Sequence, residues 1–418
     1  MQPDVVIVGA GAAGVGAGRA LQARGVSFVI LEAAERMGGR TFTDTTSLAA
    51  PWDHGAQWFH CADVNPLRPE ADRLGLAYEG SDWSEETAIW QAGRWLSPEM
   101  RAEADGVIDH AMGAIYREAA KGRESSLDEV LPKAGPWAAI TRNIARLMSS
   151  AEPEAVSVCG YAEYADTEVN LIVTGGYGRL IARLAEGLPI RLGQPVTRIA
   201  QLGRGVRVEG PGGAIEAKAA IVTASTNVLN AGGIRFESGA VRGMLDLMQD
   251  VPCGFYEKVA ITLLALPQEL GGARFAWADP GDGALSMGFQ VPPGAVPMLI
   301  AHLGGDEARD LGRAGAAALQ DHVLARLVQV FGSGIAARVT GVAVTSWGEN
   351  PFVRGAYSHV RPGIWQRRRQ MIAAETGDIR FAGEAFSLPW HSTAHGAWQT
   401  GMDAAAAVAD RLGHPARA

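Results

Sequence analysis

The hydrophobic pattern of the first forty residues predicts a strand, a helix and a second strand. Val5 to Val8 form a β-branched run typical of a strand that is buried on both faces of a parallel sheet. A helix is expected over residues 12–23, and a second apolar strand over residues 28–31. Because the glycine-rich turn Gly9-Ala10-Gly11-Ala12-Ala13-Gly14 joins the first strand to the helix, the segment is typical of a nucleotide-binding βαβ unit.

Each glycine of this turn has an expected task. Gly9 permits a tight turn, Gly11 lets the backbone approach a pyrophosphate, and Gly14 lets the helix pack close to the strand. The positive N-terminus of the helix would then point at the phosphates. Glu32 follows the second strand, where a carboxylate can accept hydrogen bonds from both hydroxyls of an adenosine ribose. An acid at this position disfavours the 2′-phosphate of NADP.

The rest of the chain alternates between helical and strand-rich patterns. Residues 67–147 have helical spacing without parallel-strand runs and predict a helical insertion. Residues 171–222 return to short strands, with a hairpin turn at 211–213. Between 239 and 347 we expect an α+β domain with strands at 258–264 and 297–303 and one long helix over 306–331. The end of the chain is expected to form a strand at 379–384, a glycine turn and a helix over 395–411.

Length and composition narrow the class of protein. A chain of 418 residues favours two domains, and 47% hydrophobic with 20% charged residues is typical of a globular protein. A net charge of −8 argues against a nucleic-acid partner. Without an apolar run long enough for a bilayer, or room for a signal peptide before the first strand, the sequence predicts a cytoplasmic protein without a membrane partner.

The cysteines and histidines do not predict a metal site. Three scattered cysteines give no disulfide framework. Two sets of residues could suggest a metal: His54, His60 and Cys61, and the pair His391 and His395. Neither has a further ligand at suitable spacing, so no metal is expected.

Ordered motifs along the whole chain resemble those of the flavin-containing amine oxidases, the family that holds monoamine and polyamine oxidases. Besides the glycine turn with Glu32, these are residues 38–40 (GGR), 53–60 (DHGAQWFH), 175–180 (GGYGRL), 195–199 (PVTRI), Lys258-Val259, Trp347 with 355–357 (GAY), 381–384 (FAGE) and 395–398 (HGAW). The resemblance implies an α/β fold: a Rossmann-like, glutathione-reductase-like FAD-binding domain with a discontinuous α+β substrate domain. We expect residues 1–75, 172–240 and 350–418 in the first, and 76–171 and 241–349 in the second.

The resemblance also implies an FAD cofactor and the residues that hold it. Glu32 is expected at the adenosine ribose, Arg40 near the pyrophosphate, Val196 near the adenine and Glu384 near the ribityl chain. The full expected set is Gly9, Gly11, Ala13, Gly14, Glu32, Ala33, Gly39, Arg40, Ala56, Gln57, Trp58, Val196, Trp347, Gly383, Glu384 and Ala397. Members that link the flavin covalently carry a cysteine where this chain has Ala356, so a non-covalent FAD is expected.

Four residues are expected at the catalytic centre. Tyr357 and Trp398 match positions where the family places two aromatic side chains facing each other in front of the flavin. Lys258 matches a lysine that contacts flavin N5 through a water and helps the reduced flavin react with oxygen. His60 resembles a histidine that lines the substrate tunnel of polyamine-type members.

The implied reaction is hydride transfer from a neutral amine to flavin N5, which gives an imine, and reoxidation by molecular oxygen, which gives hydrogen peroxide. The resemblance implies a polyamine or another primary or secondary amine as the substrate, and acidic runs at residues 82–86 and 163–168 could receive distant ammonium groups. Alternatives are an amino-acid oxidase, a flavin desaturase or protoporphyrinogen-type oxidase, and a non-catalytic flavin-binding interaction module. A monomer or homodimer is expected.

Overall fold

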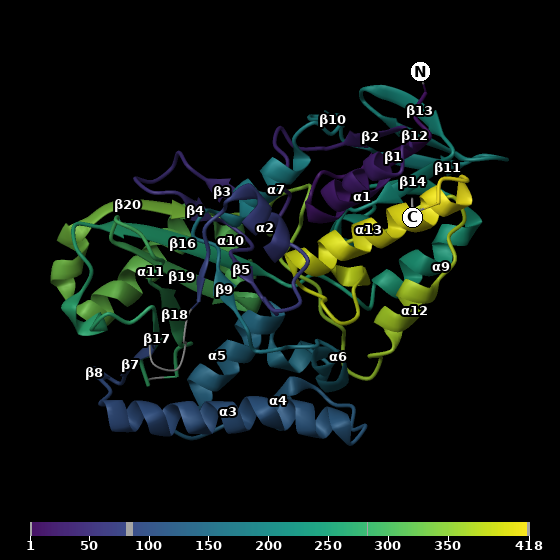
Figure 1. Cartoon of the computed structure of the whole chain (residues 1–418). Coiled ribbons are helices and arrows are strands. Elements are labelled where there is room, and N and C mark those ends of the chain that lie inside the picture. Colours follow the sequence, from purple (N-terminus) through teal and green to yellow (C-terminus); the bar gives the residue numbers. More distant parts are fainter. Residues whose placement is uncertain (1, 81–86, 282, 416–418) are drawn as a thin grey trace.

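Two large sheets organise the chain in the computed structural model, which describes residues 2–80, 87–281 and 283–415 (Figure 1). One is a five-stranded parallel sheet in the order β10-β2-β1-β14-β21. Its strands are β1 (Val5–Val8), β2 (Phe28–Leu31), β10 (Ile190–Arg191), β14 (Ala219–Val222) and β21 (Ile379–Phe381). Three segments far apart in the sequence therefore build one sheet.

The first face of this sheet is covered by helices. Helices α1 (Ala12–Ala23) and α13 (Ala394–Arg411) cross closely, because Gly401 of α13 lies against the backbone of Ala13. Helix α7 (Tyr177–Ala185) packs in the same cluster, and α2 (Arg68–Leu74) lies against α7. Small residues on α1 thus allow the two long helices to approach the sheet together.

The opposite face is covered by a second, four-stranded sheet and a helix pair. That sheet has the order β13-β12-β11-β15 and consists of β11 (Arg198–Gln201), β12 (Val206–Gly210), β13 (Gly213–Ala217) and β15 (Arg235–Glu237). The helices α9 (Gly239–Met248) and α12 (Arg367–Ala373) contact each other, and the short α8 (Thr226–Asn230) contacts α9. Val241, Met244 and Met248 of α9 pack with β1 and β2. The helix α9 therefore packs with the five-stranded sheet.

The second large sheet has seven strands in the order β20-β16-β19-β18-β17-β7-β8. They are β7 (Thr87–Gln91), β8 (Arg94–Trp95), β16 (Tyr256–Leu263), β17 (Phe275–Asp279), β18 (Met287–Gln290), β19 (Met298–Gly304) and β20 (Val339–Val344). Helices α10 (Gly305–Ala314) and α11 (Ala316–Phe331) pack with this sheet. Helix α5 (Ala138–Ser149) contacts β17 and β19, while α3 (Pro98–Ala120) runs along the lower edge of Figure 1 beside α4 (Leu127–Val130) and α6 (Val158–Ala162).

Short strands complete the architecture. β5 (Trp58–Phe59), β9 (Leu171–Ile172) and β6 (Glu79–Gly80) form a three-stranded sheet, and β3 (Thr43–Asp44) pairs with β4 (Trp52–Asp53). These pieces carry the DHGAQWFH segment from the nucleotide-binding side of the molecule toward the seven-stranded sheet.

Two expectations about secondary structure are wrong. The helix expected over residues 306–331 is two helices, because Gly315 has φ +101° and interrupts the helical backbone. The region 67–147 is not wholly helical: Thr87–Gln91 forms β7, which pairs in parallel with β17. This pairing partner is almost two hundred residues away along the chain, so local helical spacing gave no sign of it.

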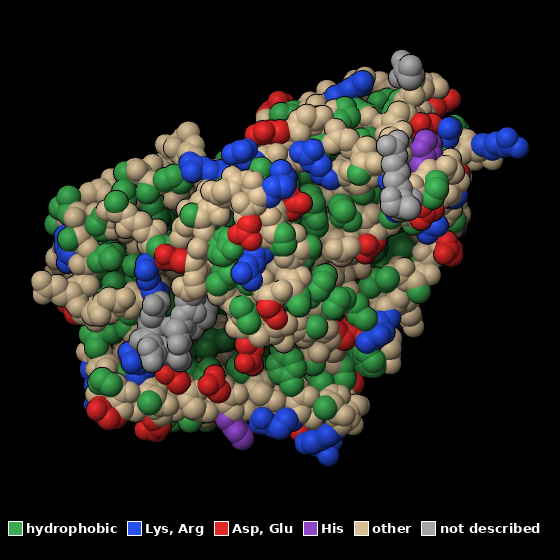
Figure 2. All heavy atoms as spheres, in the orientation of Figure 1, with side chains coloured by type: hydrophobic (Ala, Val, Ile, Leu, Met, Phe, Trp, Pro, Cys, Tyr) green, Lys and Arg blue, Asp and Glu red, His purple; other side chains and the backbone are tan. Residues whose placement is uncertain are grey.

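The surface shows no dominance of one charge on the face drawn in Figure 2, where acidic and basic side chains are interspersed. Among the helices of the described residues, none has the length and apolar character needed to cross a membrane. Within the same residues, His, Cys, Asp and Glu side chains do not gather in groups that could hold a metal ion.

Candidate active site

A cavity of about 540 Å³ is lined from both large sheets. It begins at the glycine turn after β1 and continues to the face of β16 and β19. Among the residues expected to hold the cofactor, fifteen line this cavity: Gly9, Gly11, Ala13, Glu32, Ala33, Gly39, Arg40, Ala56, Gln57, Trp58, Val196, Trp347, Gly383, Glu384 and Ala397. The remaining one, Gly14, lies beneath the turn, where a Cβ would collide with the carbonyl oxygen of Gly9.

The geometry of the turn fits a phosphate group. Gly9 has φ +102°, and a Cβ there would lie 2.5 Å from Thr223 Oγ1. A Cβ at Gly11, in contrast, would meet no protein atom nearer than 3.8 Å and would stand in the cavity at the N-terminus of α1. Backbone amides and the helix dipole therefore face a space that only a glycine leaves open for an anion.

Glu32 is held at the edge of this turn by backbone amides. Its carboxylate accepts hydrogen bonds from the amide of Ala10 at 2.6 Å and from the amide of Ala34 at 2.9 Å. Glu32 is buried and lines the cavity next to the glycine turn. This places an acceptor group at the position expected for the adenosine ribose.

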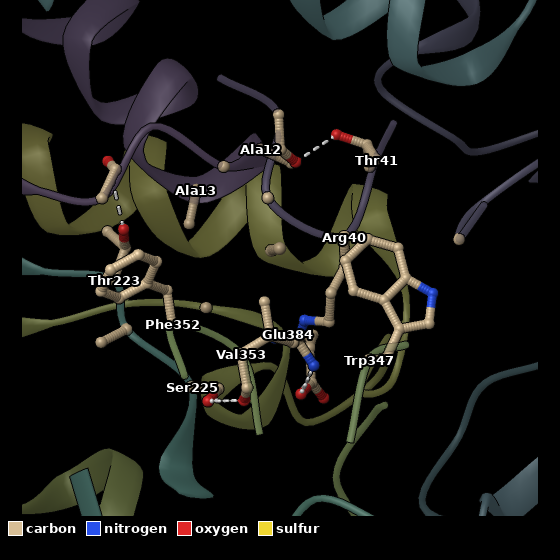
Figure 3. A pocket seen from close by; sticks show the side chains of 18 of the residues that line it. Ala12, Ala13, Arg40, Thr41, Thr223, Ser225, Trp347, Phe352, Val353 and Glu384 are labelled. Atoms are coloured by element: carbon tan, nitrogen blue, oxygen red, sulfur yellow. Dashed lines mark hydrogen bonds and ion pairs between the residues drawn. The ribbon is translucent and has the colours of Figure 1, made fainter. Parts of the chain in front are cut away.

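An ion pair between Arg40 and Glu384 crosses the middle of the cavity wall (Figure 3). Nη1 of Arg40 lies 3.0 Å from Oε1 of Glu384 and also donates to the carbonyl of Ala356. Burial alone would raise the pKa of Glu384, but the Arg40 charge and the Ser358 hydroxyl hold that pKa below its usual value. The two segments that carry the pair are more than three hundred residues apart, so the ion pair ties the chain together at the site. In Figure 3 the Trp347 ring flanks Arg40.

Lys258 lies at the far end of the cavity and is almost completely buried, with 4% of its surface exposed. Its Nζ donates to the carbonyl oxygens of Asp53 at 3.1 Å and Gly55 at 2.8 Å, and to Oε1 of Gln57 at 2.7 Å. Burial lowers the pKa of Lys258 to about 8, partly countered by the charge of Asp53. The lysine therefore holds the DHGAQ segment against the seven-stranded sheet and can change its charge near physiological pH.

Tyr357 and His60, two of the residues expected at the catalytic centre, line the same cavity. The Tyr357 hydroxyl donates to the carbonyl of Leu147, which ties the ring to helix α5. His60 Nδ1 lies 2.7 Å from Oδ1 of Asn170. Burial lowers the pKa of His60, although Asn170 acts in the opposite direction.

Trp398 does not face the cavity, and the predicted slot between Tyr357 and Trp398 is wrong. Trp398 is 5% exposed, belongs to the hydrophobic cluster under the five-stranded sheet, and packs against Gly16 of α1. The reason is helical geometry: on α13 the side of Trp398 faces α1, whereas Thr393, Ala394 and Ala397 line the cavity. Thr393 is the N-cap of α13 and accepts a hydrogen bond from the amide of Gly396.

The lining residues that sequence reasoning missed include Tyr256 and His302 at the lysine end of the cavity. Tyr256 stands two positions before Lys258 on β16, so the alternation of a strand could have found it. His302 lies on β19 directly opposite Lys258, a pairing that depends on register and not on any local motif.

Comparison with known proteins identifies the family. The family described as "Flavin containing amine oxidoreductase" matches residues 150–409, and an "NAD(P)-binding Rossmann-like domain" matches residues 7–72. The chain belongs to the flavin-containing amine oxidoreductase family and is an FAD-dependent amine oxidase. The cavity fits this assignment, because the open glycine turn and the Glu32 carboxylate suit a dinucleotide.

Relatives and solved structures agree with the fold. Polyamine oxidase 4 of Oryza sativa subsp. japonica is 28% identical over 438 residues, covering 96% of this chain and 88% of that protein. Cyclohexylamine oxidase from Brevibacterium oxydans IH-35A has a TM-score of 0.80 at 22% identity, covering 99% of this chain and 100% of that one. A redesigned putrescine oxidase has a TM-score of 0.78 at 20% identity over 98% and 100% of the two chains.

Proposed function

We propose that the protein binds FAD without a covalent link and oxidises the carbon–nitrogen bond of a primary or secondary amine, with molecular oxygen as the electron acceptor and hydrogen peroxide as a product. The observation that carries the proposal is the buried Lys258 at one end of a cavity whose other end is a phosphate-type glycine turn. Bound FAD would supply the electron acceptor for removing hydrogen from the carbon beside the nitrogen.

The cavity wall supports a non-covalent cofactor. Cys61, Cys159 and Cys253 are the cysteines of the chain, and none of them is among the residues that line the cavity. Ala356 lines it beside Tyr357, where covalent members carry a cysteine. Acid precipitation of the purified yellow protein should therefore leave the flavin in the supernatant, and flavin retained in the pellet would contradict the proposal.

The other residues would bind and orient the reactants. Tyr357 and Trp58 would enclose the body of the amine and exclude water from it. Lys258 would hold the Asp53–Gln57 segment in place and bring a positive charge to this end of the cavity, because its three N–H donors are taken by Asp53, Gly55 and Gln57 in a buried position. Arg40 would add a positive charge beside the cofactor phosphates while its pairing with Glu384 keeps the guanidinium in place.

An amino-acid oxidase is less well supported. Such an enzyme would need an arginine to bind the substrate carboxylate. Among the described residues that line the cavity, the arginines are Arg36 and Arg40. Arg40 pairs with Glu384, while Nη1 of Arg36 donates to the carbonyl of Gly39 and its guanidinium lies 4.1 Å from the centre of the Phe42 ring.

Oxygen consumption tests the proposed acceptor. Turnover of a reactive amine in aerated buffer should consume one oxygen for each hydrogen peroxide formed, and catalase should return half of that oxygen. Lys258→Met should slow the reoxidation step and leave flavin reduction by the amine less affected. Turnover that needs an added dye or protein acceptor, without oxygen consumption, would contradict the role of oxygen.

A further inference from the structure

Three polar side chains share one face of the seven-stranded sheet at the lysine end of the cavity. Tyr256 and Lys258 alternate on β16, and His302 pairs with Lys258 from β19. The Tyr256 hydroxyl lies 2.7 Å from Nδ1 of His302, and the Tyr256 ring centre lies 5.9 Å from that of Tyr357. All four residues line the cavity, so the hydrogen-bonded Tyr256–His302 pair forms part of its wall.

This pair packs against an aromatic ring and is uncharged. The His302 ring stacks on Phe275 of β17 with ring centres 5.8 Å apart and an interplanar angle of 19°. Burial holds the pKa of His302 well below its usual range, and the charge of Lys258 lowers it further. Burial also raises the pKa of Tyr256. Both groups are therefore neutral at physiological pH.

A neutral imidazole and a phenol leave one donor and one acceptor after their mutual hydrogen bond, whichever tautomer the histidine adopts. A free amine can use both, since its N–H donates and its lone pair accepts. An ammonium ion has only donors, and the nearby Lys258 would repel it. The pair thus favours an uncharged nitrogen at this end of the cavity.

In the described part of the chain, no carboxylate that lines the cavity is left unpaired to balance a second ammonium ion. Among the described residues that line it, the carboxylates are Glu32 and Glu384. Glu32 is bound by two backbone amides, while Glu384 is bound by Arg40, Ser358 and the amide of Ser392.

The acidic runs of the sequence do not supply such a group in the described part of the chain. Residues 82–86 lie outside the described residues. Glu163 pairs with Arg369 at 2.6 Å, and Asp166 accepts a hydrogen bond from the amide of Glu168. The side chains of Glu163, Asp166 and Glu168 are not among the residues that line the cavity. A buried ammonium without a counter-charge is strongly unfavourable.

We propose that the substrate is a compact monoamine with an apolar body, and that the Tyr256–His302 pair holds its nitrogen as the free base. The proposal rests on the amine oxidase function and names the substrate class of that same site. The aromatic side chains Trp58 and Tyr357 would pack against the apolar body. A diamine or polyamine would bring a second charge to a wall where both carboxylates of the described residues, Glu32 and Glu384, already have hydrogen-bond partners.

The test compares amines by anaerobic flavin reduction in a stopped-flow instrument. Cyclohexylamine and phenethylamine should reduce the flavin with an apparent second-order rate constant at least about 100-fold above that of putrescine or spermidine, the penalty expected for an uncompensated buried charge. Below the amine pKa, the apparent dissociation constant of the monoamine should fall about tenfold for each unit by which the pH is raised, because the free base is the bound form. Faster reduction by putrescine or spermidine would overturn the substrate class and leave the proposed function intact. Reduction by none of these amines would instead count against the proposed function.

Two tyrosine variants test the pair itself. Tyr256→Phe should weaken monoamine binding by about threefold to tenfold, the effect of one lost hydrogen bond, with a smaller change in the limiting rate. Tyr177→Phe is the matched control, because Tyr177 is fully buried outside the cavity lining and its hydroxyl has no partner among the described residues. Equal dissociation constants for the two variants would show that the Tyr256–His302 pair does not contact the substrate.

Discussion

Replacing Lys258 by methionine should change how the stability of the protein depends on pH. Burial lowers the pKa of Lys258 from 10.5 to about 8. A difference of about 2.5 between the pKa values of the unfolded and folded states corresponds to about 3 kcal/mol. At pH 7 this energy opposes folding, because the charged lysine is buried.

The sign of the effect follows from proton binding. Between pH 8 and 10.5 the unfolded chain keeps the lysine proton that the folded protein has lost, so the free energy of unfolding rises with pH in this window. The methionine variant has no such group. The stability of wild type relative to Lys258→Met should therefore rise by about 3 kcal/mol between pH 7 and 10.5. At neutral pH, removal of the buried charge partly offsets the loss of three hydrogen bonds to Asp53, Gly55 and Gln57.

Urea unfolding followed by tryptophan fluorescence measures this difference at saturating FAD. Lys121→Met is the matched control, because Lys121 is 52% exposed and pairs with Glu118 on the surface of α3. The control should follow the wild-type pH dependence closely. Parallel stability curves for wild type and Lys258→Met across the window would refute the reasoning.

Three further predictions follow from close packing and from the nucleotide end of the cavity. Gly401→Ala should destabilise the protein by more than about 2 kcal/mol, because the new Cβ would collide with the backbone of Ala13. The control Gly106→Ala, on the exposed face of α3, should stabilise the protein by about 0.5–1 kcal/mol. Urea unfolding measures both changes, and equal effects would contradict the close contact between α1 and α13. Glu32→Gln should weaken FAD binding by roughly tenfold to a hundredfold in a flavin fluorescence titration, and unchanged affinity would remove Glu32 from the site. Trp398→Phe should lower stability by about 1–2 kcal/mol and leave the rate of flavin reduction within about twofold, while a large loss of rate without a loss of stability would place Trp398 at the reaction after all.

Local signals in the sequence were enough to predict the strands and the helix around the glycine turn. The helix over residues 12–23 and the strands at 5–8 and 28–31 form where the pattern places them. Their hydrophobic runs, glycine turn and terminal acid are contiguous, so each element is specified by residues near it in the chain.

The substrate end could not be predicted in the same way, because long-range pairing creates it. His302 reaches the cavity only through the register of β19 with β16, and β7 joins the sheet only through its contact with β17. Trp398 was predicted at the site and is not there. A motif suggested that it faces the cavity, but its position on α13 directs the side chain into the hydrophobic core. Motif matching gives the position along the chain, whereas the helix direction decides which face a residue presents.

The proposed function requires this cavity to use FAD to oxidise an amine. Anaerobic mixing of the purified yellow protein with single amines, followed by the visible flavin absorbance, tests it most directly. A monoamine should bleach the flavin within the first turnover, and air should restore the colour with formation of hydrogen peroxide. A flavin that keeps its colour with every monoamine, diamine, polyamine and amino acid tried would contradict it.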